Sequence, residues 1–378
     1  MKTQKNKGLF RVMAVVVMIA AIITVIAVLA AGSAYVPKIA SDTANGETIS
    51  LLEGNVYEFA SDYTKECSAG KYNYSDMYFP KDAEFSWTNS ADGALYYTFS
   101  ISRNADMSDA AEYFCPDTKV TVSDLFMGTK YYYRITAHYE NKDVKSRIFD
   151  ITTDYLPRTI KLDGVSNSRD IGGYLTVDGT HRIKQGMIYR SGVVDNITDL
   201  GKKQALGTYG INFDLDLRGS ETDITTSPIS ADIGYQRENA PYYASGSSGI
   251  ISPDYKDALI NEVKVFANPD NYPILVHCSL GRDRTGTICF LINGLCGVGE
   301  LDLFMDYEMS FFSVMGSDDS GTPAKKVGED FQSLYDYISD YSESEVLSED
   351  IEAFMKEYLG ITDEEISSIR NTLLEEMA

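Results

Sequence analysis

The chain has 378 residues, 44% of them hydrophobic, and this length predicts about two domains with hydrophobic cores of their own. Its formal net charge of −23 argues against nucleic acid or an anionic membrane surface as a partner, because the long-range field repels both. An anionic ligand must therefore be held by local basic groups.

Residues 1–34 have the pattern of a membrane-targeting segment. Lysines and Arg11 precede Val12–Ala31, an uncharged apolar run long enough to cross a bilayer. The basic flank predicts that residues 1–11 stay in the cytoplasm and that the chain after Ala31 lies outside it. Small residues at 30–34 also suit signal-peptidase cleavage, but the length of the run favours an uncleaved anchor. We expect a single-pass membrane protein, or a secreted protein if the segment is cleaved.

Residues 35–154 alternate between apolar and polar side chains in several short stretches, which is typical of a β-sandwich. The lead-in is irregular, and we expect one edge strand there, at Val56–Phe59. The run from Leu125 to Ala137, with Trp87 ahead of it, resembles a fibronectin type III module over residues 80–153. The module is interpreted as a stalk or as a binding face. Two cysteines of this region, Cys67 and Cys115, are candidates for a disulfide outside the cytoplasm, though spacing alone leaves their pairing open.

Residues 155–378 alternate strands with helices, which predicts an α/β domain with helices around a central, mostly parallel sheet. Thr198 is placed to cap a helix, and Thr362 with Glu365 forms a capping-box pattern. Residues 219–253 form a long polar connection, either a lid or a plain surface segment, and a helix is expected over Tyr255–Phe266.

A short apolar strand, Tyr272–Val276, is followed by a loop and then by an apolar helix that begins near Thr285. The loop reads His277-Cys278-Ser279-Leu280-Gly281-Arg282-Asp283-Arg284-Thr285. A cysteine is nucleophilic as the thiolate, and the N–H groups at a helix N-terminus favour such an anion. Arg284 offers a planar fork for two phosphoryl oxygens, and Gly281 lets the loop turn with its amides inward. The segment therefore predicts nucleophilic attack on a phosphate ester.

This segment resembles the signature loop of the protein tyrosine phosphatase superfamily, in which His-Cys-x5-Arg is followed by Thr or Ser. With the motifs around Asn167, Tyr189 and Asp216, residues 156–378 are similar to a bacterial branch of broad activity that includes phosphoinositides. The resemblance implies that Cys278 is the nucleophile and Arg284 the phosphate clamp. It also implies that Asp216 is the general acid and that Asp283 is a loop aspartate involved in the same chemistry. The phosphate-binding loop comprises Ser279, Leu280, Gly281, Arg282 and Arg284.

The residues alone leave three carboxyl groups as candidate acids: Asp216 at a strand end, Asp283 in the loop and Asp170. Arg169, Asp170 and Arg218 are candidates for lining the pocket, or for pairing with neighbouring opposite charges. The chemistry suggests that Thr285 donates its hydroxyl to the sulfur of Cys278 and that His277 orients the loop.

Arg282 stands where the family loop has lysine, and it is a candidate for reading a second phosphate. We expect a hydrolase that uses no metal or cofactor and acts on phosphotyrosine, other phosphoproteins or phosphoinositides. The alternatives are an extracellular inositol polyphosphate phosphatase and a catalytically silent surface binding protein.

Overall fold

The computed structural model describes residues 39–64, 80–244, 246–313, 324–342 and 344–377. It divides into two compact units. The first consists of Met1–Asn45, Phe85–Val120 and Tyr132–Phe149, and the second of Gly46–Glu84, Thr121–Tyr131 and Asp150–Ala378. The sequence suggested one boundary between residues 154 and 155. The structure instead groups two earlier segments with the α/β part of the chain.

The N-terminal strands form two sheets that pack face to face, as the alternating pattern predicted. One sheet has the order β1-β3-β6 and the other β2-β9-β7-β4-β5, with β8 paired to β7. Their core is aromatic: the Phe85 ring lies 4.8 Å from that of Phe99 and 5.1 Å from that of Tyr133. The bounds are β1 Ile39–Ser41, β2 Glu47–Ile49, β3 Ala83–Asn89, β4 Tyr96–Ser102, β5 Ala111–Cys115, β6 Lys119–Val122, β7 Lys130–Tyr139, β8 Lys142–Lys145 and β9 Phe149–Thr153.

The edge strand expected at Val56–Phe59 is wrong, because this stretch lies in helix α2, Gly54–Ser61. Val56, Phe59 and Ala60 are buried, and their spacing of three and four residues places them on one helical face. The Phe59 ring lies 4.9 Å from that of Phe312, and the Tyr63 hydroxyl donates to Glu308 Oε1 at 3.1 Å. These contacts explain why the segment belongs to the α/β unit.

A second early segment, Thr121–Tyr131, is held in the same unit by hydrogen bonds. Tyr209 donates to Asp124 Oδ1 at 2.6 Å, and Arg158 Nη2 donates to the Asp124 carbonyl at 3.2 Å. The Met127 N–H donates to Gln185 Oε1 at 2.8 Å. A fragment that starts at residue 155 therefore lacks partners that the α/β unit uses.

The α/β unit is built on a five-stranded sheet of order β10-β12-β15-β13-β14. Strands β12, β15, β13 and β14 are parallel, and the short β10 is antiparallel to β12, so the predicted mostly parallel sheet is confirmed. The central strand β15 is buried along its whole length, which explains its nearly continuous apolar sequence. The bounds are β10 Arg169–Asp170, β12 Ile188–Ser191, β13 Phe213–Asp216, β14 Gly234–Arg237 and β15 Ile274–His277.

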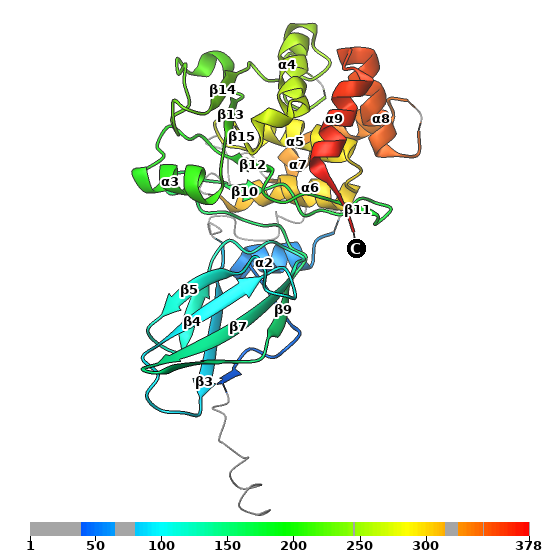
Figure 1. Cartoon of the computed structure of the whole chain (residues 1–378). Coiled ribbons are helices and arrows are strands. Elements are labelled where there is room, and N and C mark those ends of the chain that lie inside the picture. The colour runs from blue at the N-terminus through cyan, green and yellow to red at the C-terminus, as the bar shows by residue number, and fades with distance from the viewer. Residues whose placement is uncertain (1–38, 65–79, 245, 314–323, 343, 378) are drawn as a thin grey trace, which may run out of the picture. The chain divides into compact units, whose positions relative to one another are not determined.

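Helices surround this sheet (Figure 1), and α5 is the most buried of those whose burial the structure describes. Small residues let neighbours approach α5 closely: a Cβ on Gly286 would lie 2.9 Å from Cδ2 of Tyr307. Thr198 caps α3, and Thr362 with Glu365 forms the predicted capping box. The bounds are α3 Asp199–Lys203, α4 Lys256–Ala267, α5 Asp283–Leu295, α6 Glu300–Glu308, α7 Ala324–Ser339, α8 Leu347–Ala353 and α9 Asp363–Leu373. Strand β11, His181–Ile183, pairs antiparallel with β16, Leu374–Glu376.

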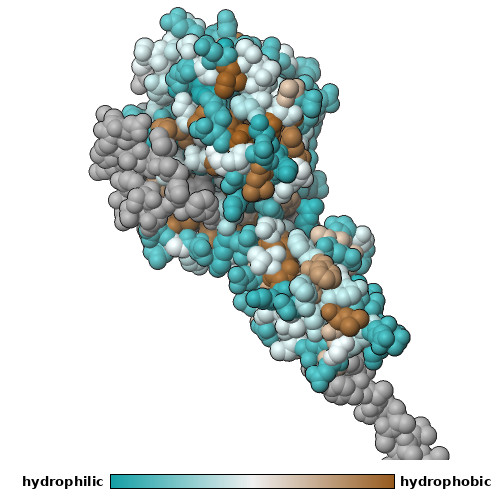
Figure 2. All heavy atoms as spheres, turned by 90° about the vertical axis from the view of Figure 1, so that its left-hand side faces the viewer, coloured by the Kyte–Doolittle hydropathy of each residue, from teal (hydrophilic) through white to brown (hydrophobic). Residues whose placement is uncertain are grey.

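The predicted membrane span, Val12–Ala31, lies outside the residues that the structure describes, as does Cys67. Within the described ranges, no helix is both long and apolar enough to cross a bilayer. Cys115 is buried and forms no disulfide with a described residue. The face drawn in Figure 2 is mainly hydrophilic, with hydrophobic residues in small separate groups.

Candidate active site

The signature loop joins the carboxyl end of β15 to the N-terminus of α5, as predicted. Cys278 is buried, with 3% of its surface exposed, and its sulfur accepts a hydrogen bond from the Gly281 N–H at 3.2 Å. Gly281 has a φ of 69°, and a Cβ there would lie 2.2 Å from the Ser191 carbonyl oxygen. Only glycine fits this turn, which aims a backbone N–H at the sulfur.

The carbonyl groups of the loop are held from behind by two side chains. Asn167 Nδ2 donates to the carbonyls of Leu280, at 2.9 Å, and Gly281, at 3.0 Å. Arg190 Nη2 donates to the Gly281 carbonyl at 2.8 Å. These bonds hold the carbonyls of Leu280 and Gly281 toward the protein interior. This role could not be predicted from the sequence, although both side chains lie in motifs that carried the family resemblance.

A buried ion-pair cluster fixes these two supports. Asp306 on α6 accepts from Arg169 Nε at 2.8 Å and from Arg190 Nη1 at 2.5 Å. Arg169 also donates to Asn167 Oδ1 at 2.5 Å. Burial alone raises the pKa of Asp306, but the two arginines outweigh it and hold the pKa below its ordinary value. Arg169, a candidate for lining the pocket, therefore lies fully buried in the support of the loop.

His277 is fully buried between β13 and the loop. Its Nε2 lies 3.1 Å from Asp214 Oδ1, and Ser227 donates to the other oxygen of Asp214 at 2.6 Å. Burial alone lowers the pKa of His277, but the Asp214 carboxylate outweighs it and raises the pKa above its usual value. A buried histidine whose ring nitrogen lies against a carboxylate in this way can orient the loop.

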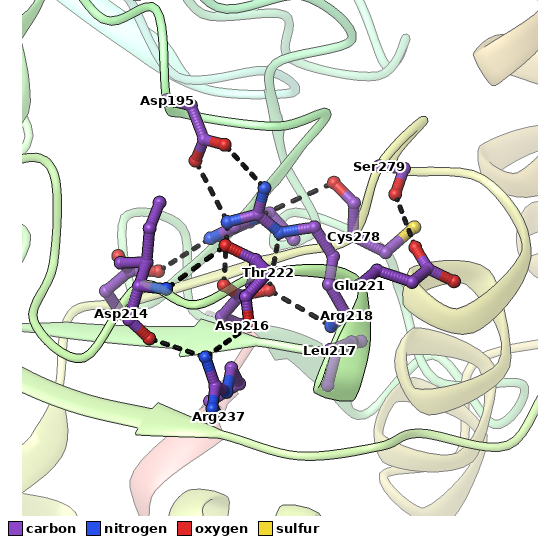
Figure 3. Close-up of polar contacts among 12 residues, drawn as sticks. Asp195, Asp214, Asp216, Leu217, Arg218, Glu221, Thr222, Arg237, Cys278 and Ser279 are labelled. Carbon is purple, nitrogen blue, oxygen red and sulfur yellow. Dashed lines mark hydrogen bonds and ion pairs between the residues drawn. The ribbon is translucent and has the colours of Figure 1, made fainter.

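Asp216, the predicted general acid, is fully buried, and Arg218 lies beside its carboxylate (Figure 3). The carboxylate oxygens accept hydrogen bonds from basic and hydroxyl groups. Arg218 donates through Nε to Oδ1 at 2.9 Å and through Nη2 to Oδ2 at 2.8 Å, and Tyr235 donates to Oδ2 at 3.1 Å. Burial alone raises the pKa of Asp216, but hydrogen bonds from Arg218 and the charge of His277 hold it below the ordinary value. The structure therefore places the predicted acid in a buried ion pair with Arg218.

The other two candidates for the pocket lining are also buried in ion pairs. Arg218 pairs with Asp195 at 2.7 Å as well as with Asp216. Asp170 pairs with Arg158 at 2.8 Å and accepts from the Gly172 N–H at 2.8 Å. Both residues are therefore paired with neighbouring opposite charges, which was the alternative to lining the pocket.

Arg284 reaches back to the segment that follows β13. Its Nη1 donates to the Leu217 carbonyl at 3.1 Å, and its Nη2 donates to Glu221 Oε1 at 2.5 Å. The other oxygen of Glu221 accepts from Ser279 Oγ at 3.0 Å, so this half-exposed carboxylate bridges both ends of the loop. The sequence motifs do not single out Glu221. Glu221 follows a parallel strand that ends beside the loop, and this position was the signal in the sequence that could have marked it as a site residue.

Asp283 is the first residue of α5, and 29% of its side chain is exposed. Its Oδ1 accepts from Arg282 Nε at 2.9 Å and from the Tyr243 hydroxyl at 2.6 Å. Arg282 is 4% exposed, and its guanidinium carbon lies 5.4 Å from the centre of the Phe311 ring. Its side chain therefore does not project toward solvent, as it would if it bound a second phosphate group of the substrate.

Thr285 is fully buried, and its hydroxyl has no hydrogen-bond partner among the described residues. The predicted bond from Thr285 to the sulfur of Cys278 is therefore absent from this structure. Where the chain is described, no group of three or more His, Cys, Asp or Glu side chains is arranged to hold a metal ion.

A buried cysteine in a strand-loop-helix turn, with a loop N–H donating to its sulfur and an arginine six positions later, defines an α/β protein with a Cys-x5-Arg loop. The model of the tyrosine phosphatase family matches residues 160–375, more than half of the sequence, and the chain belongs to this family.

Two relatives carry tyrosine-protein phosphatase names. DG1060 of Dictyostelium discoideum is 31% identical over 85 residues, which cover 22% of this chain and 46% of that protein. H16_A0669 of Cupriavidus necator is 28% identical over 174 residues, covering 39% of this chain and 61% of that protein. The chain thus spans about half the length of the curated relatives it matches.

Two solved structures are also similar in part. The catalytic core of Siw14 covers 53% of this chain and 95% of its own, at 15% identity and a TM-score of 0.30. A fibronectin type III-like protein from Clostridium thermocellum covers 20% of this chain and 79% of its own, at 23% identity and a TM-score of 0.17.

Proposed function

We propose that the protein hydrolyses phosphomonoesters through a cysteinyl-phosphate intermediate. The observation that carries the proposal is the sulfur of Cys278, which accepts the Gly281 N–H at the N-terminus of α5. The same amide and helix terminus that favour a thiolate also favour the phosphoryl oxygens. Arg284 adds a guanidinium fork at the far end of the loop.

In the first step the sulfur of Cys278 attacks phosphorus, and the bond to the leaving oxygen breaks as that oxygen receives a proton. Asp283 is the proposed acid, because it is partly exposed beside the loop, whereas Asp216 is buried in an ion pair with Arg218. In the second step the Asp283 carboxylate takes a proton from water, and the water oxygen displaces the sulfur from phosphorus. Inorganic phosphate leaves, and both groups return to their starting states.

The proposed substrates are phosphotyrosine and other protein phosphoesters. The family supports this class, and the enclosed position of Arg282 gives no support to recognition of a second phosphate. We further propose that the protein is exported and anchored by Val12–Ala31, with the catalytic unit outside the cytoplasm. The basic flank before the apolar run supports this placement.

The full chain is tested on an aryl phosphate and a phosphotyrosine peptide in the presence of a chelator. We expect hydrolysis of both substrates and complete loss of activity in Cys278→Ser. Activity that survives in Cys278→Ser would overturn the mechanism. Phosphoinositides and phytate are the comparison substrates, and faster turnover of either would replace the proposed substrate class.

A further inference from the structure

Tyr243 lies in the long connection between β13 and α4 and is bound to the first two turns of α5. Its backbone N–H donates to Thr287 Oγ1 at 3.0 Å, and its hydroxyl donates to Asp283 Oδ1 at 2.6 Å. Residues four apart on a helix lie on one face, so Tyr243 is hydrogen-bonded to two residues on the same face of α5. The segment around this tyrosine is therefore docked on the helix that begins at the signature loop.

The backbone at Tyr243 adopts a conformation that a bulky residue rarely takes. Its φ is 58°, in the left-handed region, and the turn is closed by the Ile250 N–H, which donates to the Tyr243 carbonyl at 3.0 Å. Backbone strain of this kind persists where several surrounding contacts hold it in place, and it is concentrated at functional sites. Here the contacts that hold it are those to Thr287 and Asp283.

The hydroxyl of Tyr243 is also joined to a second tyrosine. It lies 2.6 Å from the hydroxyl of Tyr307, a fully buried residue of α6 whose ring stacks on Phe331 at 4.1 Å. Burial raises the pKa of Tyr243 well above its usual value, so the phenol keeps its proton. Since that proton goes to Asp283, the Tyr307 hydroxyl is the donor between the two phenols.

These contacts distinguish the two oxygens of Asp283. Oδ1 accepts from both Tyr243 and Arg282, whereas Oδ2 has no hydrogen-bond partner in the described part of the chain. An oxygen that already accepts two donors is a poor place for a proton. In the neutral carboxyl group the proton therefore resides on Oδ2.

We propose that Tyr243 is a positioning residue for the acid step: it engages Oδ1 of Asp283, so that Oδ2 carries the proton to the leaving oxygen. The inference rests on the proposed function and on Asp283 as the acid. As the sulfur-phosphorus bond forms and the phosphorus-oxygen bond breaks, the Oδ2 proton moves to the leaving oxygen. The charge left on the carboxylate is stabilised at Oδ1 by Tyr243 and Arg282.

The test uses the full chain and two substrates, phenyl phosphate, whose leaving group needs a proton, and p-nitrophenyl phosphate, whose leaving group needs it less. In Tyr243→Phe we expect kcat for phenyl phosphate to fall about tenfold, the size of one hydrogen bond to a charged group, and kcat for p-nitrophenyl phosphate to fall less. The alkaline limb of the pH-rate profile should move to higher pH, because the ionised acid loses a donor. The charged and titratable groups that face this acid are Arg282, Arg284, Tyr243 and Tyr307.

Tyr242→Phe is the matched control, because this neighbouring side chain is 38% exposed and only packs edge-on against the Tyr243 ring at 5.7 Å. It should leave both rates and the pH profile unchanged. Tyr307→Phe should shift them in the same direction as Tyr243→Phe, but less.

A double variant separates positioning from general loss of structure. In an Asp283→Asn background, Tyr243→Phe should add no further leaving-group dependence, since the group it positions is gone. Equal losses on both substrates with an unmoved pH limb, or an additive effect in the double variant, would overturn the inference. If Cys278→Ser is inactive while Asp283→Asn shows no leaving-group dependence, the acid assignment and this inference fail while the phosphatase mechanism stands.

Discussion

The two sides of the signature loop are built differently. The side that faces the protein is held by fully buried charges, with Arg169, Arg190 and Asp306 behind the carbonyls and His277 with Asp214 beside them. The exposed side carries Glu221 and Asp283, which are 50% and 29% exposed. Buried charges have little freedom to change partners, whereas partly exposed ones can exchange partners with a ligand. The buried side therefore fixes the shape of the loop, and the exposed side is where the proposed chemistry takes place.

The largest effect is expected from breaking the buried side. Asp306→Ala leaves two arginines without their shared carboxylate, and loss of one partner of a buried pair destabilises a protein by about 3–5 kcal/mol. We expect a lower urea midpoint of unfolding and loss of activity at temperatures where the wild type is active. Asp232→Ala, at an exposed aspartate, is the control and should change neither. An unchanged midpoint in Asp306→Ala would show that the buried cluster does not hold the loop.

The next effect distinguishes the two carboxylates. Asp283→Asn should lower kcat for phenyl phosphate by roughly 100- to 10,000-fold, the usual range for loss of a general acid, with little change in the urea midpoint. Asp216→Asn should lower the midpoint, because Arg218 loses its buried partner, without making the rate depend on the leaving group. If the strong leaving-group dependence appeared in Asp216→Asn instead, the acid would be the residue suggested by the family resemblance.

A smaller effect on the buried side should appear as a pH dependence of stability. The pKa of His277 is raised above the ordinary histidine value of 6.5, so its pairing with Asp214 contributes stability that is complete below that value. This contribution is lost as the pH rises through the higher folded-state pKa. The urea midpoint of the wild type should fall over that range, and that of His277→Gln should not. Parallel curves for the two proteins would contradict the assigned charge.

The smallest effect is expected at the exposed side. Glu221→Gln removes an ion pair that is half exposed, and such pairs contribute less than about 1 kcal/mol to stability. Inorganic phosphate should inhibit this variant more strongly than the wild type, because phosphate no longer competes with a carboxylate for Arg284. Weaker inhibition would mean that Glu221 orients Arg284 for the anion.

The signature loop could be predicted from sequence because its signals are local. An apolar strand, a glycine in the turn and an apolar helix follow one another, and the structure has all three in order. Helix α2 was misread because Val56–Phe59 is too short to show a period, and its helical face is evident only from contacts such as Phe59 with Phe312.

The roles of the carboxylates could not be predicted, because they depend on residues far away in the sequence. Asp216 accepts a hydrogen bond from Tyr235 of the neighbouring strand, and Asp283 is contacted by Tyr243, forty residues earlier in a connection without periodicity. Position at a strand end marked Asp216 as a candidate acid, and its buried ion pair with Arg218 is evident only from the structure.

The most direct test of the central claim is to denature the full chain during turnover of a radiolabelled phosphotyrosine peptide and to identify the labelled residue by mass spectrometry. The account predicts a phosphoryl group on the sulfur of Cys278, which is absent from Cys278→Ser. Turnover by the wild type with the label on another residue, or with no label under conditions that preserve thiophosphate esters, would contradict it.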